Sequence, residues 1–196
     1  SLPSLREVPR ETVRDAWQRQ RFTPLDNEYL VVTRARRGEQ GNDAAAAGLR
    51  QAATYMLAPL EVERDARGPD EAGVPALRSF GDSLGRWTEL SDPTRPARAA
   101  ARSIDEHGEG AAFRGLFADS LAELGQRTGL PRELADRMAD VGESWGTVAD
   151  RLDEIAEWEG TKPELFAEAE SLVADIADRE EAIYSALREE LGGRDG

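Results

Sequence analysis

The segment ELADRMADVGESWGTVADRLDEI, residues 133–155, decides the fold of this chain. Its large apolar residues alternate between spacings of four and three, and they are Leu134, Met138, Val141, Trp145, Val148, Leu152 and Ile155. This heptad spacing predicts one apolar seam along an amphipathic α-helix. After Gly160, a second helix with similar apolar spacing is predicted from Pro163 to Leu191. Because only a few residues join the two helices, we expect a long antiparallel helix hairpin over residues 133–191.

The chain between Asp43 and this hairpin also has the apolar spacing of helices. Asp43 is placed to cap a helix that ends near Leu57, before Pro59. Further helices are predicted over residues 74–90, over an Ala-rich segment that ends near His107, and over residues 111–127. Turns that contain Gly or Pro separate these segments, so we expect a bundle of separate helices over residues 43–191.

The first part of the chain differs from the rest. Residues 8–34 are predicted to contain a short helix that begins at Thr12 and a strand at residues 28–33, EYLVVT. The backbone groups of a strand need hydrogen-bond partners. We therefore expect this strand to pair either with the extended first residues of the chain or with a strand outside it.

The predicted fold class is mainly all-α. It is an irregular bundle of about six to seven helices, with one short N-terminal strand and a long C-terminal antiparallel helix hairpin. We expect a single helical domain over residues 1–191 and a disordered tail at residues 192–196.

Charge is concentrated in the second half of the chain. Residues 101–196 hold ten basic and twenty-four acidic side chains, and this difference equals the formal net charge of the whole protein, −14. Such a surface repels phosphate groups and anionic lipids, so we expect binding neither to nucleic acid nor to membranes. The excess of acidic residues suggests a salt-adapted, halophilic host. With no cysteine, no signal peptide and no apolar segment of about 20 residues, a cytoplasmic location is expected.

The segment FGDSLG, residues 80–85, matches the pattern Gly-x-Ser-x-Gly around Ser83 and is similar to the first block of the GDSL esterases. A serine nucleophile requires a strand-to-helix turn, a histidine base and an oxyanion donor. Here the preceding residues 75–79 have helical character, and His107 lacks the Asp-x-x-His spacing of those esterases. The motif is therefore interpreted as a chance match inside a helix.

Three other polar features of the sequence are candidate sites. His107 precedes Gly108, as expected of a residue at a helix C-terminus. A row of carboxylates shares one helical face that points away from the apolar seam, which favours a solvated surface, and it consists of Glu133, Asp136, Asp140 and Glu143. Di-iron bundles need Glu-x-x-His pairs, which are absent from the sequence. A basic cluster, interpreted as a solvated loop, consists of Arg34, Arg36 and Arg37. We expect no catalytic, cofactor-binding or metal site.

Several short blocks together resemble the C-terminal domain of the butirosin-biosynthesis protein H family. The resemblance extends from about residue 8 to residue 190, and its blocks are the opening helix with EYLVV 28–32, GLR 48–50, ML 56–57, GVPALR 73–78, GRW 85–87, FRGLF 113–117, GESW 142–145 and EEAIY 180–184. In that family a papain-like N-terminal domain supplies the catalytic Cys and His, and the founding member transfers an acyl group from a carrier protein to an aminoglycoside. The resemblance implies an accessory helical domain without catalytic residues of its own.

Three hypotheses for function follow. The first is a non-catalytic accessory domain that docks on and supports an N-terminal acyltransferase- or peptidase-like domain of the same parent protein. The alternative is a free-standing protein-interaction module, or a homodimerisation module, built on the 133–191 hairpin. The third is a stand-alone serine esterase that uses Ser83.

Overall fold

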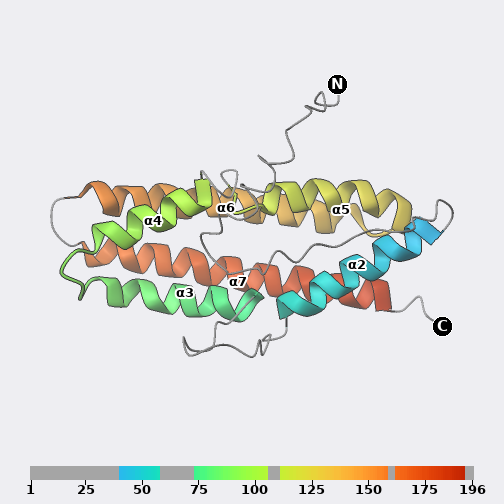
Figure 1. The fold of residues 1–196 in the computed structure, drawn as a ribbon, viewed down its shortest axis with the longest axis horizontal. Helices are drawn as coiled ribbons and strands as arrows, with labels where there is room; N and C mark the ends of the chain where they lie inside the picture. The colour runs from blue at the N-terminus through green and yellow to red at the C-terminus, as the bar shows by residue number, and fades with distance from the viewer. Residues whose placement is uncertain (1–39, 58–72, 106–110, 159–161, 193–196) are drawn as a thin grey trace, which may run out of the picture. The chain divides into compact units, whose positions relative to one another are not determined.

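A computed structural model describes residues 40–57, 73–105, 111–158 and 162–192. These residues form six helices, which all belong to one compact unit (residues 38–196) (Figure 1). The helices are α2 (Gln40–Leu57), α3 (Gly73–Trp87), α4 (Thr94–Asp105), α5 (Arg114–Thr128), α6 (Arg132–Glu157) and α7 (Pro163–Gly192). The described residues contain no strand, so the predicted all-α class is confirmed. The short helix and strand predicted within residues 8–34 lie outside the described residues.

The predicted hairpin is present as α6 and α7, which run antiparallel (Figure 1). The helices contain 26 and 30 residues, which at 1.5 Å per residue makes them about 39 and 45 Å long. All seven residues of the heptad seam are buried. Because these side chains lie in the core of the chain itself, the seam holds the bundle together.

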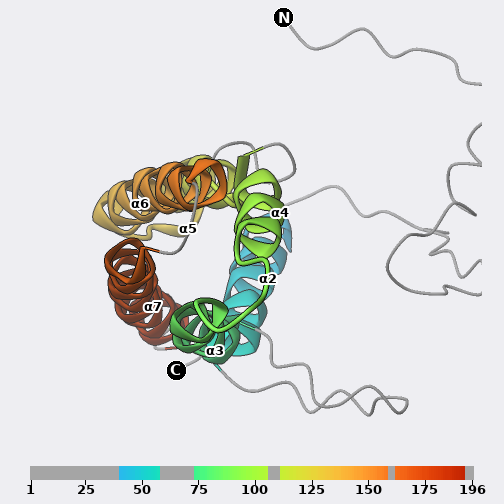
Figure 2. The ribbon, with the colours of Figure 1, turned by 90° about the vertical axis from the view of Figure 1, so that its left-hand side faces the viewer.

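Four shorter helices complete the bundle in two pairs, and we call each pair a column. The helices α4 and α5 follow one another along α6, while α2 and α3 follow one another along α7 (Figure 1). Viewed end on, the two columns and the two long helices surround a common centre (Figure 2). Chain direction alternates from the α2–α3 column to the α4–α5 column, then to α6 and α7 (Figure 1). The unit is thus an up-and-down four-helix bundle in which two of the four helices are broken.

Glycine makes the close contact at the first break possible. Gly73 begins α3 with φ +67°, and a Cβ atom at this position would lie 2.4 Å from the carbonyl oxygen of Met56, near the end of α2. That separation is far below van der Waals contact, so a residue with a side chain would force the two helix ends apart. The absence of a side chain at residue 73 therefore allows α3 to start directly against α2.

Several predicted helix boundaries need correction. The first helix of the bundle begins at Gln40, before the expected cap Asp43, and the helix predicted over residues 74–90 ends at Trp87. A turn follows, in which the Thr88 hydroxyl donates to the Gly85 carbonyl at 2.7 Å. The helix predicted from residue 111 begins only at Arg114, because residues 111–113 form a turn. Gly192 belongs to α7 and not to the predicted tail.

Two other helix ends are formed by local hydrogen bonds. Gly129 ends α5 in the left-handed conformation, with φ 70°, and its N–H donates to the Gly125 carbonyl. The Asp92 carboxylate accepts hydrogen bonds from the backbone N–H groups of Thr94 and Arg95, each at 3.2 Å, and so caps α4. None of the described helices is both long and apolar enough to cross a membrane.

Replacing Gly73 by alanine should destabilise the protein by about 2 kcal/mol or more, since the change adds strain at positive φ and a clash with Met56. The matched control is Gly48→Ala in α2, where an added Cβ meets no atom within 4 Å. This control should stabilise the protein by about 0.5–1 kcal/mol through helix propensity. Urea unfolding of both variants measures the two effects, and equal effects of the two substitutions would contradict the proposed packing.

Candidate functional site

Ser83, the candidate nucleophile in the sequence, lies inside α3 and not at a strand-to-helix turn. Its hydroxyl donates to the Phe80 carbonyl of the same helix at 2.7 Å. This back-bonded serine is typical of a residue in a helix interior. The interpretation of the motif as part of a helix is thus confirmed, whereas His107 and the cluster Arg34, Arg36 and Arg37 lie outside the described residues.

The carboxylate row on α6 faces solvent. All four members, Glu133, Asp136, Asp140 and Glu143, are exposed. Asp136 lies 3.6 Å from Arg132, one turn earlier in the same helix. Among the described residues, no three His, Cys, Asp or Glu side chains are arranged to hold a metal ion.

The strongest polar interaction in the described core joins α5 to α7. Glu180 is fully buried, and its two carboxylate oxygens accept hydrogen bonds from Nε and Nη2 of Arg114 at 2.8 and 2.9 Å. The Trp145 indole of α6 also donates to Glu180, at 3.4 Å, and the Arg114 guanidinium lies 5.9 Å from the Trp145 ring centroid. Three helices therefore meet at one bidentate ion pair, which we call the Arg114–Glu180 pair.

Two aromatic side chains pack beside this pair. Tyr184 lies one helical turn beyond Glu180, and Phe117 lies one turn beyond Arg114, with 6.0 Å between their ring centroids. Burial raises the pKa of the Tyr184 phenol above its ordinary value, and the negative charge of Glu180 raises this pKa further, while Arg114 lowers it. Tyr184 is therefore a neutral phenol in the folded protein.

The Arg114–Glu180 pair is linked to an unusual turn. Ala112 and Phe113 have φ angles of 46° and 63°, in the left-handed region that disfavours residues with side chains. Besides its bonds to Glu180, Arg114 donates from Nη1 to the Ala112 carbonyl at 2.9 Å. A single guanidinium therefore binds both the buried carboxylate and the turn that precedes α5.

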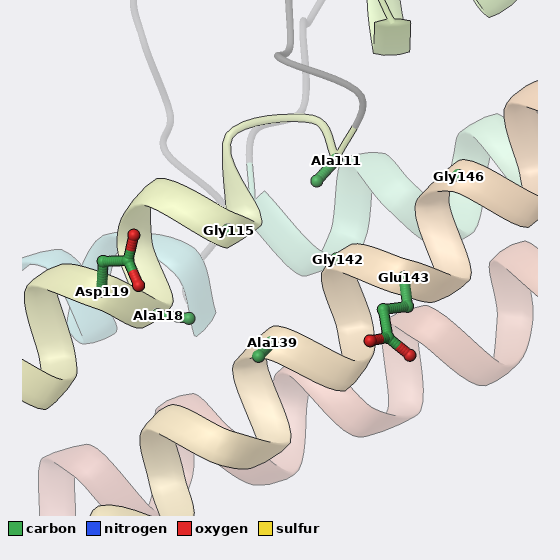
Figure 3. A pocket seen from close by; sticks show the side chains of 8 residues that line it. All are labelled: Ala111, Gly115, Ala118, Asp119, Ala139, Gly142, Glu143 and Gly146. Carbon is green, nitrogen blue, oxygen red and sulfur yellow. The ribbon is translucent and has the colours of Figure 1, made fainter.

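Next to this turn is a groove between α5 and α6. It has a volume of about 410 Å³ and is lined by Ala111, Gly115, Ala118, Asp119, Ala139, Gly142, Glu143 and Gly146 (Figure 3). A Cβ atom on Gly142 would lie 3.3 Å from both the Ala111 Cβ and the Gly115 nitrogen, so α6 contacts the turn closely. Asp119 and Glu143 are the charged residues of this lining. The groove thus combines small side chains with two carboxylates.

Two large apolar side chains project from the same region into solvent. Phe113 is 53% exposed and Leu116 is 57% exposed, which makes them the most exposed large hydrophobic residues in the described part of the chain. Of the other exposed hydrophobic residues, Trp158 is covered on one face by the Lys162 ammonium, 3.2 Å from its ring centroid. We call Phe113 and Leu116 the α5 apolar surface.

Within this arrangement, Glu180 is a structural group and is not in contact with solvent. Both oxygens of Glu180 are engaged and the residue is inaccessible to solvent. Glu180 was not among the candidate residues from the sequence, although the apolar spacing around it indicates that it is buried. Ala169, Val173, Ile176, Ile183 and Leu187 are spaced 4, 3, 7 and 4, and Glu180 occupies the seam position inside the gap of seven. A carboxylate at a seam position predicts a buried basic partner.

Replacing Glu180 by glutamine should destabilise the protein by about 3–5 kcal/mol, because it leaves the buried Arg114 charge without its counterion. The neighbouring substitution Glu181→Gln is the control. Glu181 pairs with Arg78 at the surface, where both side chains are about half exposed, so its loss should cost at most about 1 kcal/mol. Chemical denaturation compares the two variants. Equal destabilisation by Glu180→Gln and Glu181→Gln would show that the buried pair contributes no more to stability than the surface pair.

Stability should fall above pH 10 because of Tyr184. The unfolded phenol loses its proton near pH 10, whereas the folded phenol, with its raised pKa, keeps it. The folded state then binds more protons, so stability decreases by up to about 1.4 kcal/mol per pH unit. The Tyr184→Phe variant should lack this part of the slope, and the exposed control Tyr55→Phe should retain it. Unfolding curves between pH 9 and pH 11.5 test the prediction, which an unchanged slope in Tyr184→Phe would refute.

The chain was also compared with known proteins. No curated protein and no solved structure matches it. A family model described as a domain of unknown function (DUF4872) matches residues 12–187, which include every helix described above except the last residues of α7. Because this match covers most of the chain, the protein belongs to the DUF4872 family.

Proposed function

We propose that this chain is a non-catalytic accessory domain of a butirosin-biosynthesis-protein-H-like protein. It docks on and supports an N-terminal acyltransferase- or peptidase-like domain. The observation that carries this proposal is the α5 apolar surface, Phe113 and Leu116, exposed beside a strained turn that a buried ion pair holds. Backbone strain of this kind persists where the surrounding structure enforces it, and it is concentrated at functional sites.

The resemblance to the butirosin-biosynthesis protein H family supports the same region. Arg114 and Phe113 lie in the block FRGLF 113–117, Trp145 in GESW 142–145, and Glu180 and Tyr184 in EEAIY 180–184. Three of the blocks on which the resemblance rests therefore meet in the folded chain at the Arg114–Glu180 pair.

The residues of the α5 apolar surface indicate which side chains the partner presents to it. Burying a Phe or Leu side chain contributes about 1.5–3 kcal/mol, so the partner offers apolar side chains to Phe113 and Leu116. Asp119 lies one turn beyond Leu116 and, with Glu143, lines the adjoining groove. Charge complementarity then requires Arg or Lys on the partner at this edge. The docking surface of the catalytic domain is therefore apolar with a basic margin.

The alternative, a dimerisation module built on the 133–191 hairpin, has less support. The apolar seam of the hairpin is already buried against the other helices of the same chain. A dimer would have to use the α5 apolar surface in place of the seam. An esterase acting through Ser83 is not proposed, because the serine is in a helix and its hydroxyl is bonded to that helix.

The proposal is tested with the parent protein encoded by the complete reading frame. The preceding catalytic domain and this chain are produced separately and titrated against each other in a calorimeter. Leu116→Asp should weaken binding about tenfold or more, roughly 1.4 kcal/mol. The control Leu90→Asp changes a similarly exposed leucine after α3 and should leave binding unchanged.

Two outcomes would overturn the proposal. One is a reading frame that encodes no such domain, and the other is a catalytic domain that does not bind the wild-type chain. Self-association of the chain that Leu116→Asp abolishes would instead support the dimerisation module.

A further inference from the structure

Residues 112 and 113 adopt a conformation that their side chains disfavour. Left-handed backbone costs a residue with a Cβ atom roughly 1–2 kcal/mol, and here Ala112 and Phe113 adopt it in succession. Glycine would adopt it without this strain. Some interaction in the folded state must therefore compensate for the strain.

Arg114 supplies that interaction through the geometry of its guanidinium. Nε and Nη2 are bound to the two oxygens of Glu180, which fixes the plane of the group. The remaining nitrogen, Nη1, is then directed at the Ala112 carbonyl and donates to it at 2.9 Å. Because the guanidinium is planar and rigid, the orientation of the Ala112 peptide depends on the pairing with Glu180.

We propose that the Arg114–Glu180 pair is a latch that holds Ala112 and Phe113 in the left-handed conformation and so fixes the α5 apolar surface for docking. The docking part rests on the proposed function, whereas the latch itself does not. Arg114 and Glu180 are positioning residues, since neither is a member of the docking surface. Glu180 is buried and Arg114 is mostly buried, with 19% of its side chain exposed.

A double-mutant cycle on the chain alone tests the latch. Ala112→Gly in the wild-type background should increase the folding equilibrium constant about three- to fivefold, because it removes strain at residue 112. In the unlatched background, Arg114→Met with Glu180→Leu, the turn is free to relax and the gain should disappear. The control Ala111→Gly changes the neighbouring alanine, whose φ is not positive, and it should lower stability in both backgrounds. Denaturant unfolding measures all six proteins.

The conservative variant Arg114→Lys keeps the positive charge but cannot form the bidentate pair with Glu180. It replaces the unlatched background in the cycle if that background does not fold. The gain from Ala112→Gly should be smaller in this variant than in the wild type. Backbone chemical shifts of residues 112 and 113 report the sign of φ and should change in either variant. An equal gain from Ala112→Gly in every background would overturn the latch.

Calorimetric titration with the catalytic domain distinguishes the latch from the proposed function. If the latch is correct, the unlatched variant should bind the catalytic domain about tenfold more weakly, although Phe113 and Leu116 are intact. A positive cycle without any binding by the wild-type chain would refute the proposed function and leave the latch supported. A negative cycle would refute the latch whatever the binding result.

Discussion

A carboxylate inside an apolar core is stable only if a counterion accompanies it, and Arg114 is that counterion for Glu180. Many features of the structure follow from this requirement. Arg114 is the first residue of α5, so the start of that helix has to lie beside α7. The column formed by α4 and α5 is interrupted at this level, and its chain turns through left-handed residues before the helix resumes. Trp145 of α6 completes the cluster, so that α5, α6 and α7 are held together at one point.

The same stretch of α7 also contacts the other column. Arg78 of α3 pairs with Asp178 at 2.8 Å and with Glu181 at 2.6 Å, and both carboxylates raise the pKa of the guanidinium. These groups are exposed, so their contribution is within about 1 kcal/mol. Breaking the buried pair costs several times more. Glu180 and Glu181 are neighbours in the sequence. Because Glu180 is buried, its pair with Arg114 contributes more to stability than the exposed pair of Glu181 with Arg78.

The parts of the fold that depend on local periodicity could be predicted from the sequence. The seam from Leu134 to Ile155 predicts α6 and its antiparallel partner, and the helix end predicted near residue 127 matches the end of α5 at Thr128. The turn at residues 111–113 could not be predicted, because Ala-Ala-Phe contains no glycine and its conformation is enforced by a contact 66 positions away. The candidate site was missed for the same reason. Glu180 stands out only as an interruption of an apolar spacing, and the sequence does not identify which of many arginines pairs with it.

The distance between the partners along the chain has a consequence for the order of folding. The α6–α7 hairpin has a short connection and can form early, since little loop entropy opposes it. Arg114 lies 66 residues before Glu180, so their encounter requires closure of a much longer loop. Until that encounter, the Glu180 carboxylate must stay hydrated, and the apolar surface around it cannot become dry. We therefore expect the last water to leave the core when α5 packs against α7 and the Arg114–Glu180 pair forms. A hairpin that slipped by one heptad would move Glu180 by about 10.5 Å along the helix axis, away from its contacts with Arg114 and Trp145.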